Sequence, residues 1–321
     1  MDYSKLNDII KSSKNILIIS HVNPDGDTLG SMCGLYSAIL ENYKKRCDML
    51  AISKIPDVYS YLPHLSDVKH LDDVDKSREY DLVINVDVAS IDRICDAKIL
   101  FDKAKFNVNI DHHKTNNAYG KLNFINPDAS STGEVLFECF SRMGWKVNLN
   151  TAVCIYTAIL TDTGSFRFDN TKPSTFETAS KLVEIGVNPS DIYKKVYESD
   201  SKTLVMFQAH CISKAKFLND DKIAYTLVYK KDMEKFGAGD DCMEGLTEKL
   251  RAIVTTRIAF VAKEMKSGGT KISMRSKFAD VAEICGIFGG GGHKYAAGCT
   301  IKAPVEDAAR KILEEIKKHE I

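Results

Sequence analysis

Short apolar runs alternate with amphipathic segments through the first half of the 321-residue chain, and this alternation limits the fold more than any other feature. The apolar runs cover residues 15–20, 47–52, 81–86 and 106–110. Runs this short and this continuous are typical of strands buried on both faces, and helix-length segments separate them. The sequence therefore predicts an α/β fold with an N-terminal doubly wound, mainly parallel sheet that carries helices on both faces.

The second half of the chain has a different pattern, with a long polar helix expected at residues 200–216. Candidate strands follow at residues 222–229, 257–263 and 271–275, and a terminal helix is expected at 305–319. We therefore predict an N-terminal catalytic domain over residues 1–190, a helical linker over 191–216 and a smaller C-terminal α/β domain over 217–321.

Charge and cysteine content exclude several classes of protein. Lys plus Arg and Asp plus Glu each number 44, whereas proteins that grip long nucleic acids usually carry a basic excess. The nine cysteines are odd in number and form no C-x-x-C pair, which argues against a disulfide framework and a thiolate zinc site. No apolar run approaches the ~20 residues that span a bilayer, and the start of the chain is polar. We expect a cytoplasmic protein with no membrane partner and no stable long nucleic-acid partner.

Acidic and histidine residues follow three of the apolar runs and one predicted helix, at residues 150–161. In an open α/β sheet, ligands bind outside the carboxyl ends of the strands, so clusters placed there can share one site. The candidate ligands at these positions are His21, Asp25, Asp27, Asp87, Asp111, His112, His113 and Asp162.

This set of side chains is suited to divalent metal ions. Carboxylates with a few imidazoles favour Mn²⁺, with Mg²⁺ or Co²⁺ as alternatives, and two ions ~3.5–4 Å apart are typical of phosphoryl chemistry. Each fragment alone has an ordinary structural explanation. Asp25 and Asp27 suit a turn or a helix cap, Asp87 a cap or surface position, and His112–His113 a structural pair. Their common placement at the ends of the right elements favours the metal site.

A two-metal site built from these acids needs further positive charge to bind phosphate. Four carboxylates, with a bridging hydroxide, would leave two divalent ions slightly negative overall. Arg167 lies five residues past Asp162 and is a candidate, although a surface position explains it equally well. Ser131 and Thr132 are weaker candidates, because an N-terminal capping box with Glu134 accounts for the segment.

Five motifs in this chain resemble those of the DHH phosphoesterases, a family of metal-dependent enzymes. The segment 21–31 (HVNPDGDTLGS) resembles the first motif, and residues 111–113 (DHH) the motif that names the family. Asp87 and residues 161–164 (TDTG) match the other two, and 288–298 (FGGGGHKYAAG) resembles the glycine signature of the DHH-associated C-terminal domain. The resemblance extends over about residues 10–300.

The resemblance implies roles for the matching residues. One ion would be held by His21, Asp25 and Asp87. The other would be held by Asp27, Asp87, His112 and Asp162, so that Asp87 bridges the two. Asp111 would orient the site, and His113 would stabilise charge on the scissile phosphate.

The second domain would bind the substrate. Gly290, Gly291 and Gly292 would present backbone N–H groups to an anion, and His293 would contact a base or phosphate. Arg275 would form a bidentate phosphate contact beside Ser276. A flexible turn and a solvated arginine are the structural alternatives, and the resemblance favours binding. Tyr295 departs from the Arg or Asn that relatives often carry.

Within the family, the chain looks most like nano-RNase A-type proteins, which degrade oligoribonucleotides of a few residues. Many of these also dephosphorylate 3′-phosphoadenosine 5′-phosphate. We therefore expect a manganese-dependent exonuclease on short RNA or a small phosphorylated nucleotide, in a chain that allows a homodimer. The alternatives are a linear or cyclic dinucleotide phosphodiesterase and a pyrophosphatase or polyphosphatase. A nucleotide-sensing or RNA-binding module without activity is the alternative from outside enzymes.

Overall fold

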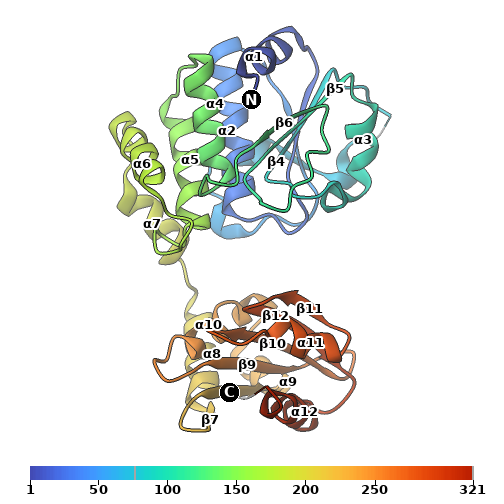
Figure 1. The fold of residues 1–321 in the computed structure, drawn as a ribbon, viewed down its shortest axis with the longest axis vertical. Coiled ribbons are helices and arrows are strands. Elements are labelled where there is room, and N and C mark those ends of the chain that lie inside the picture. Colours follow the sequence, from blue (N-terminus) through green and yellow to red (C-terminus); the bar gives the residue numbers. More distant parts are fainter. Residues whose placement is uncertain (76, 320–321) are drawn as a thin grey trace. The chain divides into compact units, whose positions relative to one another are not determined.

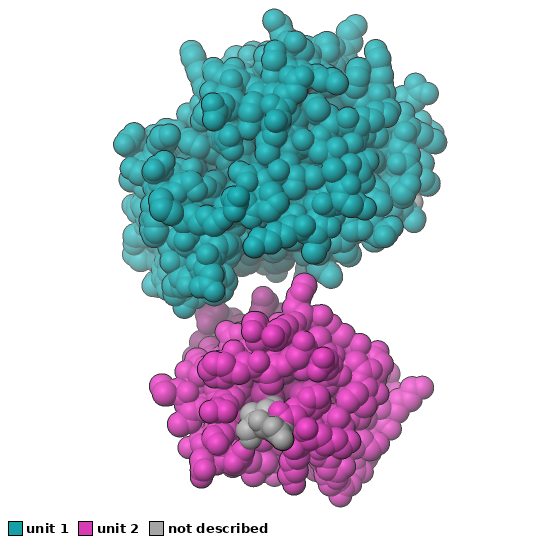
Figure 2. Space-filling model, in the orientation of Figure 1, with its two compact units in different colours: residues 1–199 teal, residues 200–321 magenta. Residues whose placement is uncertain are grey.

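The computed structural model describes residues 1–75 and 77–319, which form two compact units. Unit 1 comprises residues 1–199 and unit 2 residues 200–321 (Figures 1 and 2). Both units pair a six-stranded sheet with helices, so the predicted mixed α/β architecture is confirmed.

The sheet of unit 1 is parallel throughout and has the strand order β3-β2-β1-β4-β5-β6. The strands are β1 (Ile16–Ile19), β2 (Asp48–Ala51), β3 (Val68–His70), β4 (Leu82–Val86), β5 (Phe106–Asp111) and β6 (Leu122–Ile125). Strands β1 and β4 are buried along their whole length, as a sheet covered on both faces requires. The strand order reverses between these two strands, which creates a topological switch point.

Helices cover both faces of this sheet. Alternate residues such as Ile18 and Ile84 pack into the larger core with α1 (Tyr3–Ser12), α2 (Gly26–Tyr43), α4 (Thr132–Met143) and α5 (Leu149–Asp162). Leu17 and Val83 face the other way, toward α3 (Lys98–Lys103) and the 3₁₀ segment Ile91–Ala97. Helices α6 (Pro173–Ile185) and α7 (Pro189–Tyr197) lie beyond α5 (Figure 1). The doubly wound arrangement was therefore predicted correctly.

Glycines allow helices α2, α4 and α5 to pack closely. A methyl group on Gly30 of α2 would lie 2.5 Å from the carbonyl oxygen of Cys154 in α5. A methyl group on Gly133 of α4 would lie 2.5 Å from the Cβ of Ala158, also in α5. Because the separation of packed helices depends on the side chains at the contact, these glycines fix how near the three helices lie.

The sheet of unit 2 is mixed, with the order β11-β12-β10-β9-β8-β7 and a single parallel pair, β8 with β9, among the described residues. Its strands are β7 (Lys216–Leu218), β8 (Ile223–Val228), β9 (Ile258–Glu264), β10 (Thr270–Ser276), β11 (Gly291–His293) and β12 (Ala296–Ile301). One face packs against α11 (Val281–Ile287) and α12 (Val305–Lys317). The other packs against α8 (Lys202–Ser213), α9 (Lys230–Phe236) and α10 (Leu246–Arg251). No helix in the described part of either unit is long and apolar enough to cross a membrane.

The segment predicted as a linker, residues 191–216, is divided between the two units in the structure. Helix α7 belongs to unit 1, and the division falls between residues 199 and 200, ahead of α8. Helix α8 ends at Ser213, earlier than predicted, and buries Phe207 and Cys211 in the core of unit 2. These two residues lie four apart on one face, whereas Val205, Met206 and Ile212 of the same helix are exposed, so the sequence does not show which of its apolar residues are buried.

Candidate metal centre

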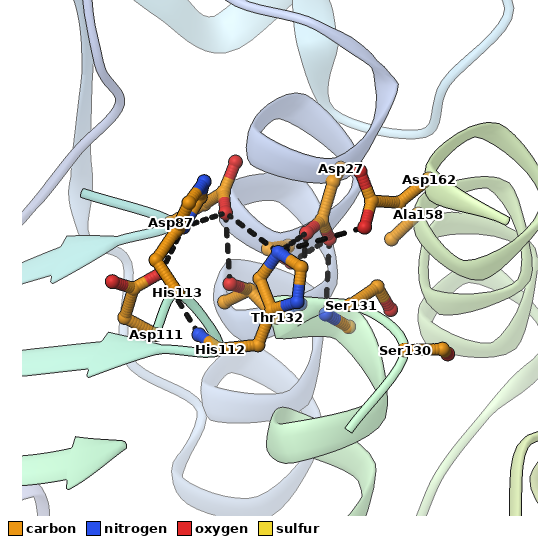
Figure 3. A network of polar contacts seen from close by, with 12 residues as sticks. Asp27, Asp87, Asp111, His112, His113, Ser130, Ser131, Thr132, Ala158 and Asp162 are labelled. Carbon is orange, nitrogen blue, oxygen red and sulfur yellow. Dashed lines mark hydrogen bonds and ion pairs between the residues drawn. The ribbon is translucent and has the colours of Figure 1, made fainter. Parts of the chain in front are cut away.

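The six predicted metal ligands meet at one edge of the unit 1 sheet, at its switch point. Figure 3 shows four of them, Asp27, Asp87, His112 and Asp162. His21 follows β1, Asp87 follows β4, and His112 follows β5. Asp25 caps the N-terminus of α2, Asp27 lies in its first turn, and Asp162 is the last residue of α5. Five separate elements therefore supply ligand atoms to one place.

The first group of ligands consists of His21, Asp25 and Asp87, whose donor atoms lie within 4.8 Å of one another. The His21 Nε2 atom lies 3.3 Å from Asp87 Oδ2 and 3.9 Å from Asp25 Oδ2. Arg93 Nη2 lies 3.0 Å from the other ring nitrogen, Nδ1, which also contacts the Val22 carbonyl at 2.8 Å. Arg93 is a basic group at this centre that the sequence pattern did not indicate.

The second group consists of Asp27, His112 and Asp162. His112 Nε2 lies 3.7 Å from Asp27 Oδ2 and 3.5 Å from Asp162 Oδ2. The same nitrogen lies 3.7 Å from Asp87 Oδ1, whereas Asp87 Oδ2 faces His21 in the first group. Asp87 thus directs one carboxylate oxygen toward each group, as a bridging ligand would.

Hydrogen bonds from helix α4 fix two buried carboxylates, those of Asp27 and Asp87. Asp27 accepts from the backbone N–H of Thr132 at 2.8 Å and of Gly133 at 3.0 Å, so it lies at the N-terminus of α4. The Thr132 hydroxyl donates to Asp87 Oδ1 at 3.0 Å. Thr132 is therefore part of the centre, although the sequence supported only its capping role. A contact across 45 residues has no local signal that could have revealed it.

The predicted capping box at α4 forms only in part. Ser131 accepts from the backbone N–H of Glu134, as expected of an N-cap. The Glu134 carboxylate accepts instead from the N–H and hydroxyl of Ser130 and from the hydroxyl of Thr175. The buried glutamate therefore joins α4 to α6 and does not close the box.

Asp111 holds His113 in a fixed orientation. Its fully buried carboxylate accepts from His113 Nδ1 at 2.7 Å and from Asn116 Nδ2 at 2.5 Å. The hydrogen bond that His113 donates to Asp111 raises the pKa of His113 to about 9, despite the opposing effect of burial. Burial alone would raise the pKa of Asp111, but the bonds from His113 and Asn116 lower it. Asp111 thus supports the centre, and His113 presents its ring beside Asp87 at 3.6 Å.

The charges of the centre are those of a cation site. Burial, followed by the charges of Asp87, Asp162 and Asp25, raises the pKa of Asp27 well above its usual value. Burial also raises the pKa of Asp162 to about 6. Crowded, buried carboxylates repel one another, and two divalent cations would offset that repulsion. Oxygen donors with a few imidazoles fit Mn²⁺, Mg²⁺ or Co²⁺, so the residues present fit the predicted metals.

Arg167 lies in the loop that follows α5. Its Nε atom donates to the carbonyl of Gly164 at 2.6 Å, which fixes the guanidinium within the loop that Asp162 begins. Burial raises the pKa of the Tyr197 phenol, and the charge of the nearby Arg167 opposes only part of that rise.

The predicted substrate-binding residues of unit 2 gather at one end of its sheet. Two of them differ from the sequence-based expectation, because Arg275 already has an acidic partner and Ser276 is buried. Arg275 is ion-paired with Glu248 at 2.6 Å, and the exposed His293 pairs with Ala296 in the β11–β12 hairpin. Ser276 is only 2% exposed, and its hydroxyl donates to the Ala279 carbonyl, so it stabilises the turn after β10 and does not face a ligand.

The glycine run is more ordered than the turn considered from the sequence. Gly291 and Gly292 belong to edge strand β11, paired with Gly298 and Ala297 of β12. The N–H of Gly290 donates to the Cys285 carbonyl, so that group is already bonded and does not face a ligand. A methyl group on Gly290 would lie 2.2 Å from the Gly298 carbonyl oxygen, which explains the glycine by close backbone approach.

Comparison with known proteins gives consistent matches to both units. Residues 15–159 match the DHH family, N-terminal domain, and residues 220–319 match the DHHA1 domain. The bifunctional oligoribonuclease and PAP phosphatase NrnA of Bacillus subtilis is 31% identical over 95% of this chain and 96% of its own length. The protein of the same name from Thermus thermophilus is 29% identical over 94% of this chain and 89% of its own length. A crystal structure of an exopolyphosphatase-related protein from Bacteroides fragilis aligns with a TM-score of 0.91 at 26% identity, covering 98% of this chain and 95% of that one.

Proposed function

The chain belongs to the DHH family of metal-dependent phosphoesterases, and from this premise we propose that it hydrolyses short oligoribonucleotides to mononucleotides. We further propose that it dephosphorylates 3′-phosphoadenosine 5′-phosphate, since relatives of nearly equal length are named for both activities.

One observation carries the proposal: Asp87 points one oxygen at each of two ligand groups. A shared carboxylate between two groups of donors is the arrangement that two-metal phosphoesterases need. His21, Asp25 and Asp87 would hold one ion. Asp27, Asp87, His112 and Asp162 would hold the other. Such ions activate water as a nucleophile and stabilise the charge of the attacking and leaving oxygens.

The other residues of the centre would orient and stabilise the reacting groups. His113, held by Asp111, would donate to a phosphate oxygen and stabilise the charge that develops there. Thr132 would keep the Asp87 carboxylate in its bridging orientation. Arg167 would supply positive charge at the end of α5.

Unit 2 would supply the substrate-binding groups. Arg275 would contact a substrate phosphate, and His293 a base or phosphate, with Gly291 and Gly292 giving close backbone approach on the edge strand. Ser276 and Gly290 would keep these groups in place. Mn²⁺ as the working metal, a cytoplasmic location and a homodimer stay predictions from the sequence.

A substrate panel tests the proposal. The purified chain is assayed with Mn²⁺ on five substrates: the linear RNA dinucleotide ApA, a 12-residue RNA, 3′-phosphoadenosine 5′-phosphate, a cyclic dinucleotide and pyrophosphate. We expect rapid release of mononucleotide from the dinucleotide and of phosphate from the phosphoadenosine compound, with both activities lost in EDTA. Faster turnover of pyrophosphate or of the cyclic dinucleotide than of the linear dinucleotide would contradict the proposal.

A further inference from the structure

An exposed aromatic ring lies at the end of the unit 2 sheet that carries Arg275. Phe278, two residues past the end of β10, is 70% exposed and makes no part of either hydrophobic core. We propose that this ring is a stacking platform for a nucleobase of the substrate, backed by Arg257. The inference rests on the proposed function, because it names the part of the substrate that this site would recognise.

The turn that carries Phe278 is held firmly. The buried Ser276 hydroxyl accepts from the Phe278 N–H at 3.1 Å and donates to the Ala279 carbonyl at 2.6 Å. Lys277 lies between Ser276 and Phe278. Its backbone N–H donates to the Arg257 carbonyl at 2.9 Å, and its Nζ donates to the Ile253 carbonyl at 2.7 Å. The ring is therefore presented by a fixed backbone, which lowers the entropy lost when a ligand binds to it.

Folding does not account for the exposure of this ring. A phenylalanine contributes to stability mainly through burial, and Phe278 remains largely in water while its neighbour Ala279 packs against the core. A single exposed apolar residue is common, so exposure alone would carry nothing. The charged groups around the ring supply the second observation.

One basic side chain lies against the Phe278 ring, and two more lie on the same turn and at the end of the preceding strand. The Arg257 guanidinium carbon lies 6.0 Å from the ring centroid, within reach of a cation–π contact, and leaves most of the ring surface open. Lys277 precedes Phe278 in the turn, with its Nζ bonded to the Ile253 carbonyl, and Arg275 lies near the end of β10, ion-paired with Glu248. An aromatic ring for the base beside cations for the backbone is how proteins bind short single strands without reading their sequence.

The strand register places this ring beside the other predicted substrate contacts. The Ser276 N–H donates to the Tyr295 carbonyl at 3.1 Å, and Val281 donates to the Lys294 carbonyl at 2.8 Å. Lys294 and Tyr295 form the tip of the β11–β12 hairpin, between His293 and Ala296. The turn at Phe278 and the hairpin are thus hydrogen-bonded neighbours. A nucleobase fits this mixture of one ring and several cations better than a protein partner, which would need a larger continuous apolar surface.

The test compares Phe278→Leu with Phe278→Trp in the full chain. Phe217→Leu is the matched control, because Phe217 is 39% exposed on β7, at the opposite edge of the same sheet. With the linear RNA dinucleotide ApA and Mn²⁺, we expect Phe278→Leu to raise KM about 5- to 150-fold with kcat little changed. Phe278→Trp and Phe217→Leu should stay within about threefold of the unchanged protein. Two analogues of the dinucleotide each lack one of its two bases. For at least one of these analogues, Phe278→Leu should leave KM unchanged.

A direct readout separates this inference from the proposed function. A dinucleotide that contains 2-aminopurine is titrated in EDTA, which prevents turnover, and stacking on Phe278 should quench its fluorescence. The quenching should be absent in Phe278→Leu and present in Phe278→Trp. If the unchanged protein cleaves the dinucleotide while Phe278→Leu alters neither KM nor quenching, the platform is wrong and the function stands. If cleavage is absent but quenching depends on Phe278, the function is wrong and the platform stands.

Discussion

Units 1 and 2 both place their candidate functional residues at one end of a six-stranded sheet, but they hold these residues in opposite ways. In unit 1 the carboxylates of Asp27, Asp87 and Asp111 are buried. Asp27 and Asp87 accept hydrogen bonds from helix α4, which is distant in sequence, and Asp111 accepts from the nearby His113 and Asn116. In unit 2 the residues that would meet substrate, such as His293 and Phe278, are exposed on turns and an edge strand.

The difference indicates a division of labour. Buried, prearranged charges cost no reorganisation when a reaction proceeds, so they act on the chemical step. Exposed groups contribute to ground state and transition state alike, so they act mainly on KM. We therefore expect substitutions in unit 1 to lower kcat and substitutions in unit 2 to raise KM.

The largest expected effect comes from Asp87→Asn. Loss of the shared carboxylate should lower kcat for the dinucleotide on the order of 10³-fold or more. Asparagine is the suitable replacement because Asp87 has a φ of 61°, which asparagine also tolerates. Asp81→Asn is the control at the other end of the same strand, where Asp81 accepts from the N–H groups of Lys14 and Asn15. Activity lost equally in both variants would mean that β4 and not the ligand is at fault.

Asp111→Asn should have the next largest effect. Asp111 accepts on both carboxylate oxygens, whereas the amide has a single acceptor oxygen and no charge to stabilise protonated His113, so kcat should fall roughly 10- to 100-fold. The double variant with His113→Gln should be little worse than His113→Gln alone, because Asp111 would act through His113. Fully additive losses in steady-state kinetics would show that the two residues act independently.

Arg275→Ala should sharpen the contrast from the side of unit 2. Loss of a phosphate contact should raise KM for the dinucleotide about tenfold while kcat changes little. Glu248→Gln removes the carboxylate that pairs with Arg275 at 2.6 Å, so KM should fall two- to threefold, on the order of a few tenths of a kcal/mol. A kcat loss in Arg275→Ala as large as that of Asp111→Asn would break the proposed division.

The smallest expected effect concerns stability in acid. Burial raises the pKa of Asp232 in unit 2, but hydrogen bonds from His210 and Lys214 outweigh it and lower the pKa overall. A carboxyl group with a lowered folded pKa stabilises the protein above its unfolded value, near pH ~4, and loses that contribution as the pH falls further. The urea midpoint of Asp232→Asn should therefore lie slightly below that of the unchanged protein at pH 6. The two should converge near pH 3, and a difference that grows in acid would contradict the assignment.

Sequence patterns predicted the strands in which an apolar run coincides with a buried position in the sheet. The buried runs ending at His21, Asp87 and Asp111 identified the central strands and their carboxyl ends. Strands β3, β7 and β11 were missed because they are short and largely exposed. Strands β6 and β12 were also missed, and in β12 the residues Ala296, Ala297 and Gly298 provide no bulky apolar run although the strand lies inside the sheet. The contact of Thr132 with Asp87 and the burial of Ser276 depend on residues distant in sequence, which spacing alone does not show.

The glycine contacts of Gly30 and Gly133 with helix α5 have a consequence for the width of the metal centre. Asp27 lies on α2, its hydrogen-bond donors on α4, and Asp162 on α5, so the spacing of these ligands is a property of helix packing. A bulkier residue at either glycine would push α2 or α4 away from α5. It would move the ligands apart while leaving each of them chemically intact. The space available to the ions is therefore set by residues that coordinate no ion themselves, since Gly30 lies three residues past Asp27 and the Gly133 N–H donates to Asp27 directly.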